Sequence, residues 1–87
     1  MEKLKLEDIK RGIGKRIFTE RTAKNLSQDA LAEALNLSRT FISKLENGNA
    51  TAKLDTYCRI ACVLEISLCE LFRMDGAAEP LDSILFY

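Results

Sequence analysis

With 87 residues and 47% hydrophobic side chains, this chain is long enough to bury one helical core but too short for two domains. Its formal net charge is zero, and no run of apolar residues is long enough to cross a membrane. The first eight residues mix both signs of charge and lack the apolar stretch of a secretion signal, so we expect a cytoplasmic protein.

The first predicted helix runs from about Asp8 to Lys24. Apolar residues at helical spacing form its inner face, namely Ile9, Ile13, Ile17 and Phe18. Gly12 and Gly14 each disfavour helix by roughly 1 kcal/mol relative to alanine. Regular helix is therefore expected to begin only near Ile13.

Two short amphipathic helices are predicted next, joined by a tight turn. Ser27 is the expected N-cap of the first, and the left-handed conformation of its C-cap suits Asn36. The residues that this helix is expected to bury are Ala30, Leu31, Ala34 and Leu35. Ser38 is the N-cap of the second, which ends at Gly48 and packs through Phe41, Ile42 and Leu45. This arrangement is typical of a helix-turn-helix, which most often binds DNA.

The other face of the second short helix carries hydrogen-bonding groups, namely Arg39, Thr40, Ser43, Lys44 and Asn47. No carboxylate occurs in this helix before Glu46. Such a face can enter the major groove of DNA and meet the edges of bases. The alternative is an ordinary solvated helix face, and the short turn with its two serine caps favours the DNA-binding interpretation.

Two further helices are predicted beyond the loop at residues 47–51. Thr51 is the expected N-cap of the fourth, whose predicted inner face is Leu54, Tyr57, Cys58, Ala61 and Leu64. Ser67 and Glu70 form a capping box that opens a short fifth helix through Leu71 and Phe72. The pattern predicts an all-α domain of five helices over residues 1–73, followed by a C-terminal tail, 74–87.

Three cysteines lie in the same region, namely Cys58, Cys62 and Cys69, and the chain has no histidine. We expect reduced thiols packed as small hydrophobic groups, with redox sensing and metal binding as alternatives. Without histidine or a glycine-rich phosphate loop, the usual catalytic pairings are missing. The sequence therefore predicts no enzyme, no metal and no cofactor.

The charge is unevenly distributed along the chain. Residues 9–53 carry a net charge of +5, residues 54–87 carry −4, and the first eight carry −1. The basic part contains the predicted helix-turn-helix and is suited to a polyanion, whose phosphates respond to local charge.

The tail has a hinge-like stretch at 76–78 and Pro80 at a position suited to the first turn of a helix. Its apolar residues are Leu81, Ile84, Leu85 and Phe86. Such surface needs a partner, either the chain's own domain or a second subunit. We expect a dimer contact, which would place two recognition helices roughly 34 Å apart on an inverted-repeat operator.

Residues 13–72 resemble the phage repressor and Cro type of helix-turn-helix protein, the Xre family. The segments that carry the resemblance are Leu26-Ser27-Gln28, residues 38–48 and residues 65–72. The resemblance implies a lambda-repressor-like fold and a sequence-specific, DNA-binding transcription regulator, more often a repressor. Activation by contact of the acidic part with polymerase is an alternative outcome. A rival from another class is a protein-interaction module on the same fold, such as an antitoxin that binds a toxin, or an adaptor.

The resemblance also implies roles for individual residues. Contacts to DNA bases fall on Arg39, Thr40 and Lys44. Contacts to DNA phosphates fall on Gln28, Ser38, Ser43, Asn47 and Lys53. Arg21 and Glu46 form an internal ion pair that ties the first helix to the third. The chain departs from the family pattern at Asn25, where glycine is usual, and at Ala52 and Lys53, where proline and serine are usual.

Overall fold

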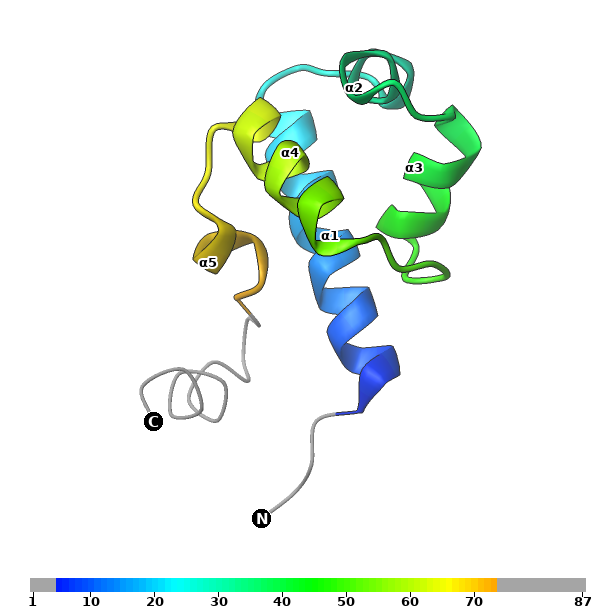
Figure 1. Cartoon of the computed structure of the whole chain (residues 1–87), viewed down its shortest axis with the longest axis vertical. Helices are drawn as coiled ribbons and strands as arrows, with labels where there is room; N and C mark the ends of the chain where they lie inside the picture. Colours follow the sequence, from blue (N-terminus) through cyan, green and yellow to red (C-terminus); the bar gives the residue numbers. More distant parts are fainter. Residues whose placement is uncertain (1–4, 74–87) are drawn as a thin grey trace.

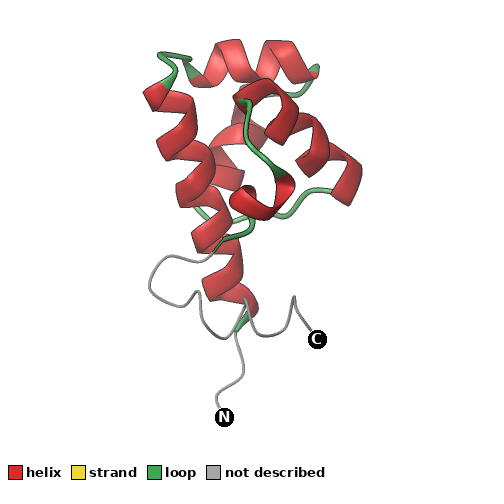
Figure 2. Cartoon of the chain, turned by 90° about the vertical axis from the view of Figure 1, so that its left-hand side faces the viewer, coloured by secondary structure: helices red, strands yellow, loops and turns green. Residues whose placement is uncertain are grey.

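The computed structural model describes residues 5–73, which form five helices around one core (Figure 1). The helices are α1 (Leu6–Ala23), α2 (Gln28–Leu35), α3 (Arg39–Glu46), α4 (Leu54–Leu64) and α5 (Leu68–Leu71). Residues 5–73 contain no strand, and the predicted all-α, five-helix fold is confirmed (Figure 2). The predicted tail contacts at Leu81, Ile84, Leu85 and Phe86 lie outside the described residues.

Three serine caps and one left-handed cap set the helix ends as predicted. Each serine hydroxyl accepts a backbone N–H at 3.0 Å, the pairs being Ser27 with Ala30, Ser38 with Phe41, and Ser67 with Glu70. Asn36 ends α2 with φ 57° and ψ 44°, the left-handed conformation. Because α2 and α3 are separated by so few residues, these caps determine the angle at which the two helices leave the turn.

The core is formed by the side chains that all five helices turn inward. Its fully buried members are Ile17, Leu31, Leu35, Ile42, Ile60, Leu64 and Leu71. α1 and α4 lie side by side at the centre of Figure 1, with α2 and α3 on one side and α5 on the other. The core therefore fixes α3 through its inner face and leaves the outer face open to a ligand.

The expected late start of α1 is wrong. The helix begins at Leu6 and runs through both Gly12 and Gly14. Gly14 is buried against the end of α3, where an added Cβ would lie 2.2 Å from the carbonyl oxygen of Leu45. Close packing of α1 against α3 offsets the weak helix propensity of this glycine.

The predicted inner faces of three helices need correction. Phe18 is 50% exposed, because the buried stripe of α1 runs through Ile13, Gly14, Ile17 and Arg21. In α2, Ala32 is buried, whereas Ala30 is half-buried and Ala34 exposed. The observed buried stripes thus differ from the predicted ones by one or two positions, while the helices themselves are present as predicted.

Helix α4 begins later than the sequence suggested, and a different set of its residues is buried. Lys53 is its N-cap in place of Thr51, and the Lys53 side chain makes no capping hydrogen bond. Leu54 is 63% exposed, and the buried residues are Tyr57, Ile60, Ala61 and Leu64.

This register also corrects the expectation for the cysteines. Cys58, Cys62 and Cys69 are all exposed, so they are not packed in the core. Cys58 and Cys62 each follow a buried residue by one position, which turns them about 100° away from the core. In residues 5–73 no three Cys, Asp or Glu side chains are grouped so as to hold a metal ion. None of the five described helices has the length and apolar character needed to cross a membrane.

Candidate nucleic-acid interface

Helix α3 carries four of the eight predicted DNA-contacting side chains, and its two caps carry two more. Its inner residues Ile42 and Leu45 are buried, which holds the helix against α1 and α2. Arg39, Thr40 and Lys44 lie on the opposite side and are exposed. The local pattern thus turns the side chains with hydrogen-bonding ends toward solvent.

An open hollow of about 270 Å³ lies where the start of α2 meets α3, and five side chains line it, namely Gln28, Arg39, Thr40, Ser43 and Lys44. All five are among the residues for which the family resemblance implies DNA contacts. None of them carries a carboxylate. The lining combines two cations, two hydroxyls and one amide, a set that can donate to base acceptors and to phosphate oxygens.

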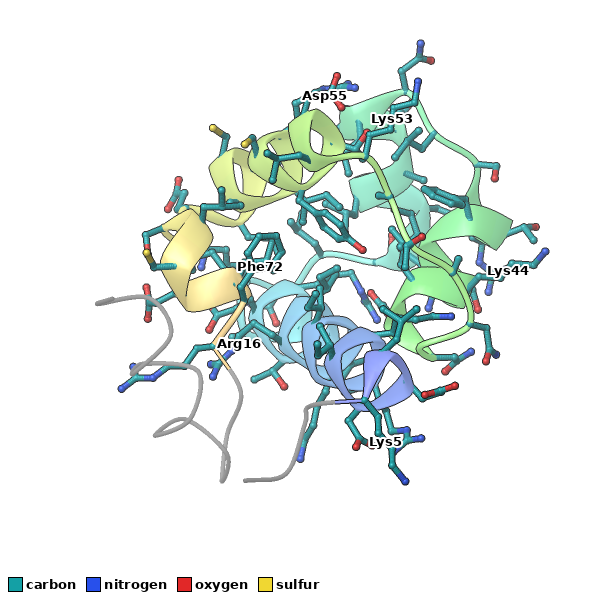
Figure 3. All side chains as sticks on the ribbon, turned by 60° about the horizontal axis from the view of Figure 1, so that its bottom comes forward. Lys5, Arg16, Lys44, Lys53, Asp55 and Phe72 are labelled. Carbon is teal, nitrogen blue, oxygen red and sulfur yellow. The ribbon has the colours of Figure 1, made fainter. Side chains whose placement is uncertain are left out.

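Three other predicted phosphate contacts lie outside this hollow. The Ser38 hydroxyl caps α3, and Asn47 is the residue at the C-cap of the same helix. Lys53 projects from the start of α4, while Lys44 projects from the outer side of α3 (Figure 3). The hollow thus collects the three predicted base contacts and two of the five predicted phosphate contacts.

Arg39 has a neighbour that the sequence did not suggest. Its Nε lies 3.7 Å from Oδ1 of Asp29 in the first turn of α2. Both side chains are well exposed, at 67% and 76%, so the pair contributes little to stability. Residues ten apart in separate helices follow no helical spacing, and the sequence carried no signal for this contact.

A buried network lies directly beneath the hollow. Arg21 donates from Nε to Oε2 of Glu46 at 2.6 Å and from Nη2 to Oε1 at 3.0 Å. Its Nη1 donates to the carbonyl oxygen of Leu26 at 2.7 Å. The two side chains are only 9% and 4% exposed. The ion pair that the family resemblance implies is thus present, and it joins α1 to the end of α3.

Gln28 connects this network to the hollow. Its Nε2 donates to Oε1 of Glu46 at 2.9 Å, a contact that the sequence did not suggest. A carboxamide carries two N–H donors, so one is held by Glu46 and the other remains for a ligand. The orientation of Gln28 is therefore set from below by the same carboxylate that pairs with Arg21.

Comparison with known proteins identifies the chain's relatives. The family HTH_3, Helix-turn-helix, matches residues 17–71. The chain is 38% identical over 56 residues to the ImmF control region 10 kDa protein of Bacillus phage phi105, covering 64% of this chain and 62% of that protein.

Two solved structures extend the comparison. The restriction-modification controller protein C.AhdI from Aeromonas hydrophila superposes with a TM-score of 0.68 at 35% identity, covering 71% of this chain and 94% of that one. SinR, a master regulator for biofilm formation solved in complex with DNA, gives a TM-score of 0.62 at 28% identity, covering 68% and 95%.

Proposed function

Because this chain belongs to the HTH_3 family of helix-turn-helix, DNA-binding transcription regulators of the Xre type, we propose that it represses transcription by occupying an operator. Repression requires only that the bound protein excludes polymerase. The observation that carries this proposal is the hollow beside α3, which gathers Gln28, Arg39, Thr40, Ser43 and Lys44 without a carboxylate in its lining.

In the proposed complex, α3 lies in the major groove and its N-terminal half meets base edges. Arg39 reads a guanine, since its planar guanidinium matches the O6 and N7 acceptors. Thr40 contacts a thymine methyl or a phosphate, and Lys44 a guanine or the DNA backbone. The free N–H of Gln28 and the Ser43 hydroxyl bind phosphates, with Ser38, Asn47 and Lys53 extending the contacts along the backbone.

The proposal includes a homodimer on an inverted repeat. A two-fold pair would place its recognition helices one turn of duplex apart, roughly 34 Å. Leu81, Ile84, Leu85 and Phe86 are the candidate dimer contacts, chosen for their apolar character in the sequence. A half-site spacing of about ten base pairs in the bound motif would support this arrangement.

The primary test is a selection of bound duplexes from a random library, at two salt concentrations, with the wild type and Arg39→Ala. The wild type is expected to yield a palindromic motif. Arg39→Ala is expected to lose about 1–3 kcal/mol of preference at one base pair in each half-site. Arg11→Ala is the matched control, because Arg11 is 70% exposed, pairs with Asp8 and lies outside the hollow, so its motif should be unchanged.

Absence of any enriched motif would contradict the proposal. So would weak, salt-sensitive binding that Arg39→Ala leaves unchanged, since phosphate contacts alone carry no sequence preference. Either result would favour the protein-interaction module on the same fold.

A second prediction concerns Asp29, which competes with DNA for Arg39. Removing a negative charge near DNA strengthens binding by itself. Asp29→Asn is expected to strengthen operator binding by about 0.3–1 kcal/mol more than that, because the exposed ion pair between Asp29 and Arg39 no longer has to open. Glu33→Gln removes the same charge from the exposed side of α2 and serves as the control. Dissociation constants at one fixed salt concentration give the comparison, and equal changes in both variants would rule out the competition.

A further inference from the structure

A second hollow, which the proposed function does not use, lies on the domain away from the DNA-facing side chains. It is an apolar groove of about 400 Å³ between the first half of α1, the start of α4 and the end of α5. The apolar residues that line it are Leu6, Ile9, Ile13, Ala52, Tyr57 and Phe72. In Figure 3, Phe72 projects from the end of α5 toward α1.

The groove is firmly built but incompletely covered. Tyr57 and Phe72 meet edge to face, with ring centroids 5.3 Å apart, and the Tyr57 hydroxyl accepts the backbone N–H of Ala52 at 3.1 Å. Leu6, on the groove's outer wall, is nonetheless 61% exposed. An exposed apolar groove of this kind on a small domain is typical of an interaction site.

We propose that this groove holds the chain's own C-terminal segment, residues 80–86. Leu81, Ile84 and Leu85 have the i, i+3, i+4 spacing that gives a helix one apolar face. The first four residues of the chain contribute only Met1 and Leu4 and present no such pattern.

The connecting chain is long enough for this docking. Seven residues, 74–80, separate Arg73 from Leu81 and can span up to about 23 Å when extended. The groove wall from Leu6 to Ile13 is about 10 Å long, at 1.5 Å per helical residue. Phe72 lines the groove, so the connection starts beside it. To dock, residues 80–86 have only to fold back over the groove from this point.

Charge favours the same occupant. Residues 74–87 contain Asp75, Glu79 and Asp82 but no basic residue. Lys10 is part of the groove lining and brings a positive charge to its edge. An acidic, apolar segment therefore finds both an apolar surface and a complementary charge.

Effective concentration favours docking of the chain's own residues 80–86 over docking of the same residues from a second copy. A short flexible connection holds a tethered segment at an effective concentration of order millimolar, which a second copy reaches only at that protein concentration. Docking within one molecule would cover Leu81, Ile84 and Leu85, so it competes with the dimer contact proposed for the same residues, and a dimer would then need another surface.

The test uses the full-length chain and nuclear Overhauser contacts. In isotope-labelled protein, the methyl groups of Leu81, Ile84 or Leu85 are expected to show contacts to the rings of Tyr57 and Phe72. In an equal mixture of labelled and unlabelled chains, a filtered spectrum that detects only contacts between molecules is expected to lack them. If the contacts appear in the filtered spectrum, the segment docks on a second copy and docking within one molecule is overturned. If the contacts are absent from both samples, docking in the groove is overturned altogether.

A pair of matched variants tests the groove itself. Leu6 and Leu54 are almost equally exposed, at 61% and 63%, but only Leu6 lines the groove. Leu6→Gln is expected to speed amide hydrogen exchange across residues 81–86 roughly tenfold, and Leu54→Gln to leave it unchanged. Equal exchange rates in the two variants would contradict the proposal. The groove shares no residue with the DNA-facing hollow. Titration of the protein with operator DNA therefore tests the proposed function independently of docking in the groove.

Discussion

Replacement of Glu46 by alanine is expected to lower the free energy of unfolding by about 3–5 kcal/mol. The carboxylate accepts two hydrogen bonds from Arg21 and one from Gln28, and it is almost wholly buried. Its removal leaves the Arg21 guanidinium in the interior, hydrogen-bonded to the carbonyl oxygen of Leu26 but without its counter-ion. A buried charge without its counter-ion is among the most destabilising states a folded domain can hold.

Urea denaturation followed by circular dichroism measures this loss. Glu33→Ala is the control, since Glu33 is exposed on α2 and its substitution should change stability by no more than about 0.5 kcal/mol. A double variant, Arg21→Met with Glu46→Leu, should recover most of the loss, because it removes both charges together. A Glu46→Ala effect no larger than that of Glu33→Ala would show that the pair does not hold α1 to α3.

The local features of this fold could be read from the sequence because their causes are local. Ser27, Ser38 and Ser67 each cap a helix through a hydrogen bond that spans three residues. Asn36 adopts its left-handed conformation within the turn itself. The outward face of α3 followed in the same way, because Ile42 and Leu45 determine which side is buried.

Features that depend on contacts between helices were harder to predict. The choice between Ala32 and Ala34 as a buried residue depends on how α2 sits against the core, which periodicity fixes only to within a position or two. The same holds for α4, where Tyr57 and Cys58 were both predicted to be buried and only Tyr57 is. Asp29 could not be associated with Arg39, since only the crossing of α2 and α3 brings them together.

The ion pair between Arg21 and Glu46 is the exception to this division. The two residues are 25 positions apart, and no spacing rule links them. They were paired because of the resemblance to a known family. The hydrogen bond from Gln28 to Glu46 escaped prediction, since the resemblance directed Gln28 toward phosphate alone.

Gly14→Ala is expected to be the other strongly destabilising substitution, and it reverses what helix propensity alone predicts. Alanine is favoured over glycine in a helix interior by roughly 1 kcal/mol. At this position, however, the added Cβ would lie 2.2 Å from the Leu45 carbonyl oxygen and 2.6 Å from that of Glu46. Both atoms belong to the backbone of α3 and cannot rotate away, so the two helices must separate.

Because separation of α1 and α3 would strain both the core and the buried ion pair, we expect Gly14→Ala to cost about 3 kcal/mol or more. In a domain of this size that corresponds to a fall in Tm of roughly 12 °C or more, measurable by thermal circular dichroism. Gly12→Ala, in the same helix, should raise the stability by about 0.5–1 kcal/mol, because propensity acts there without that contact. Equal effects of the two substitutions would mean that α1 approaches α3 less closely than the structure has it, and would remove the reason for a glycine at position 14.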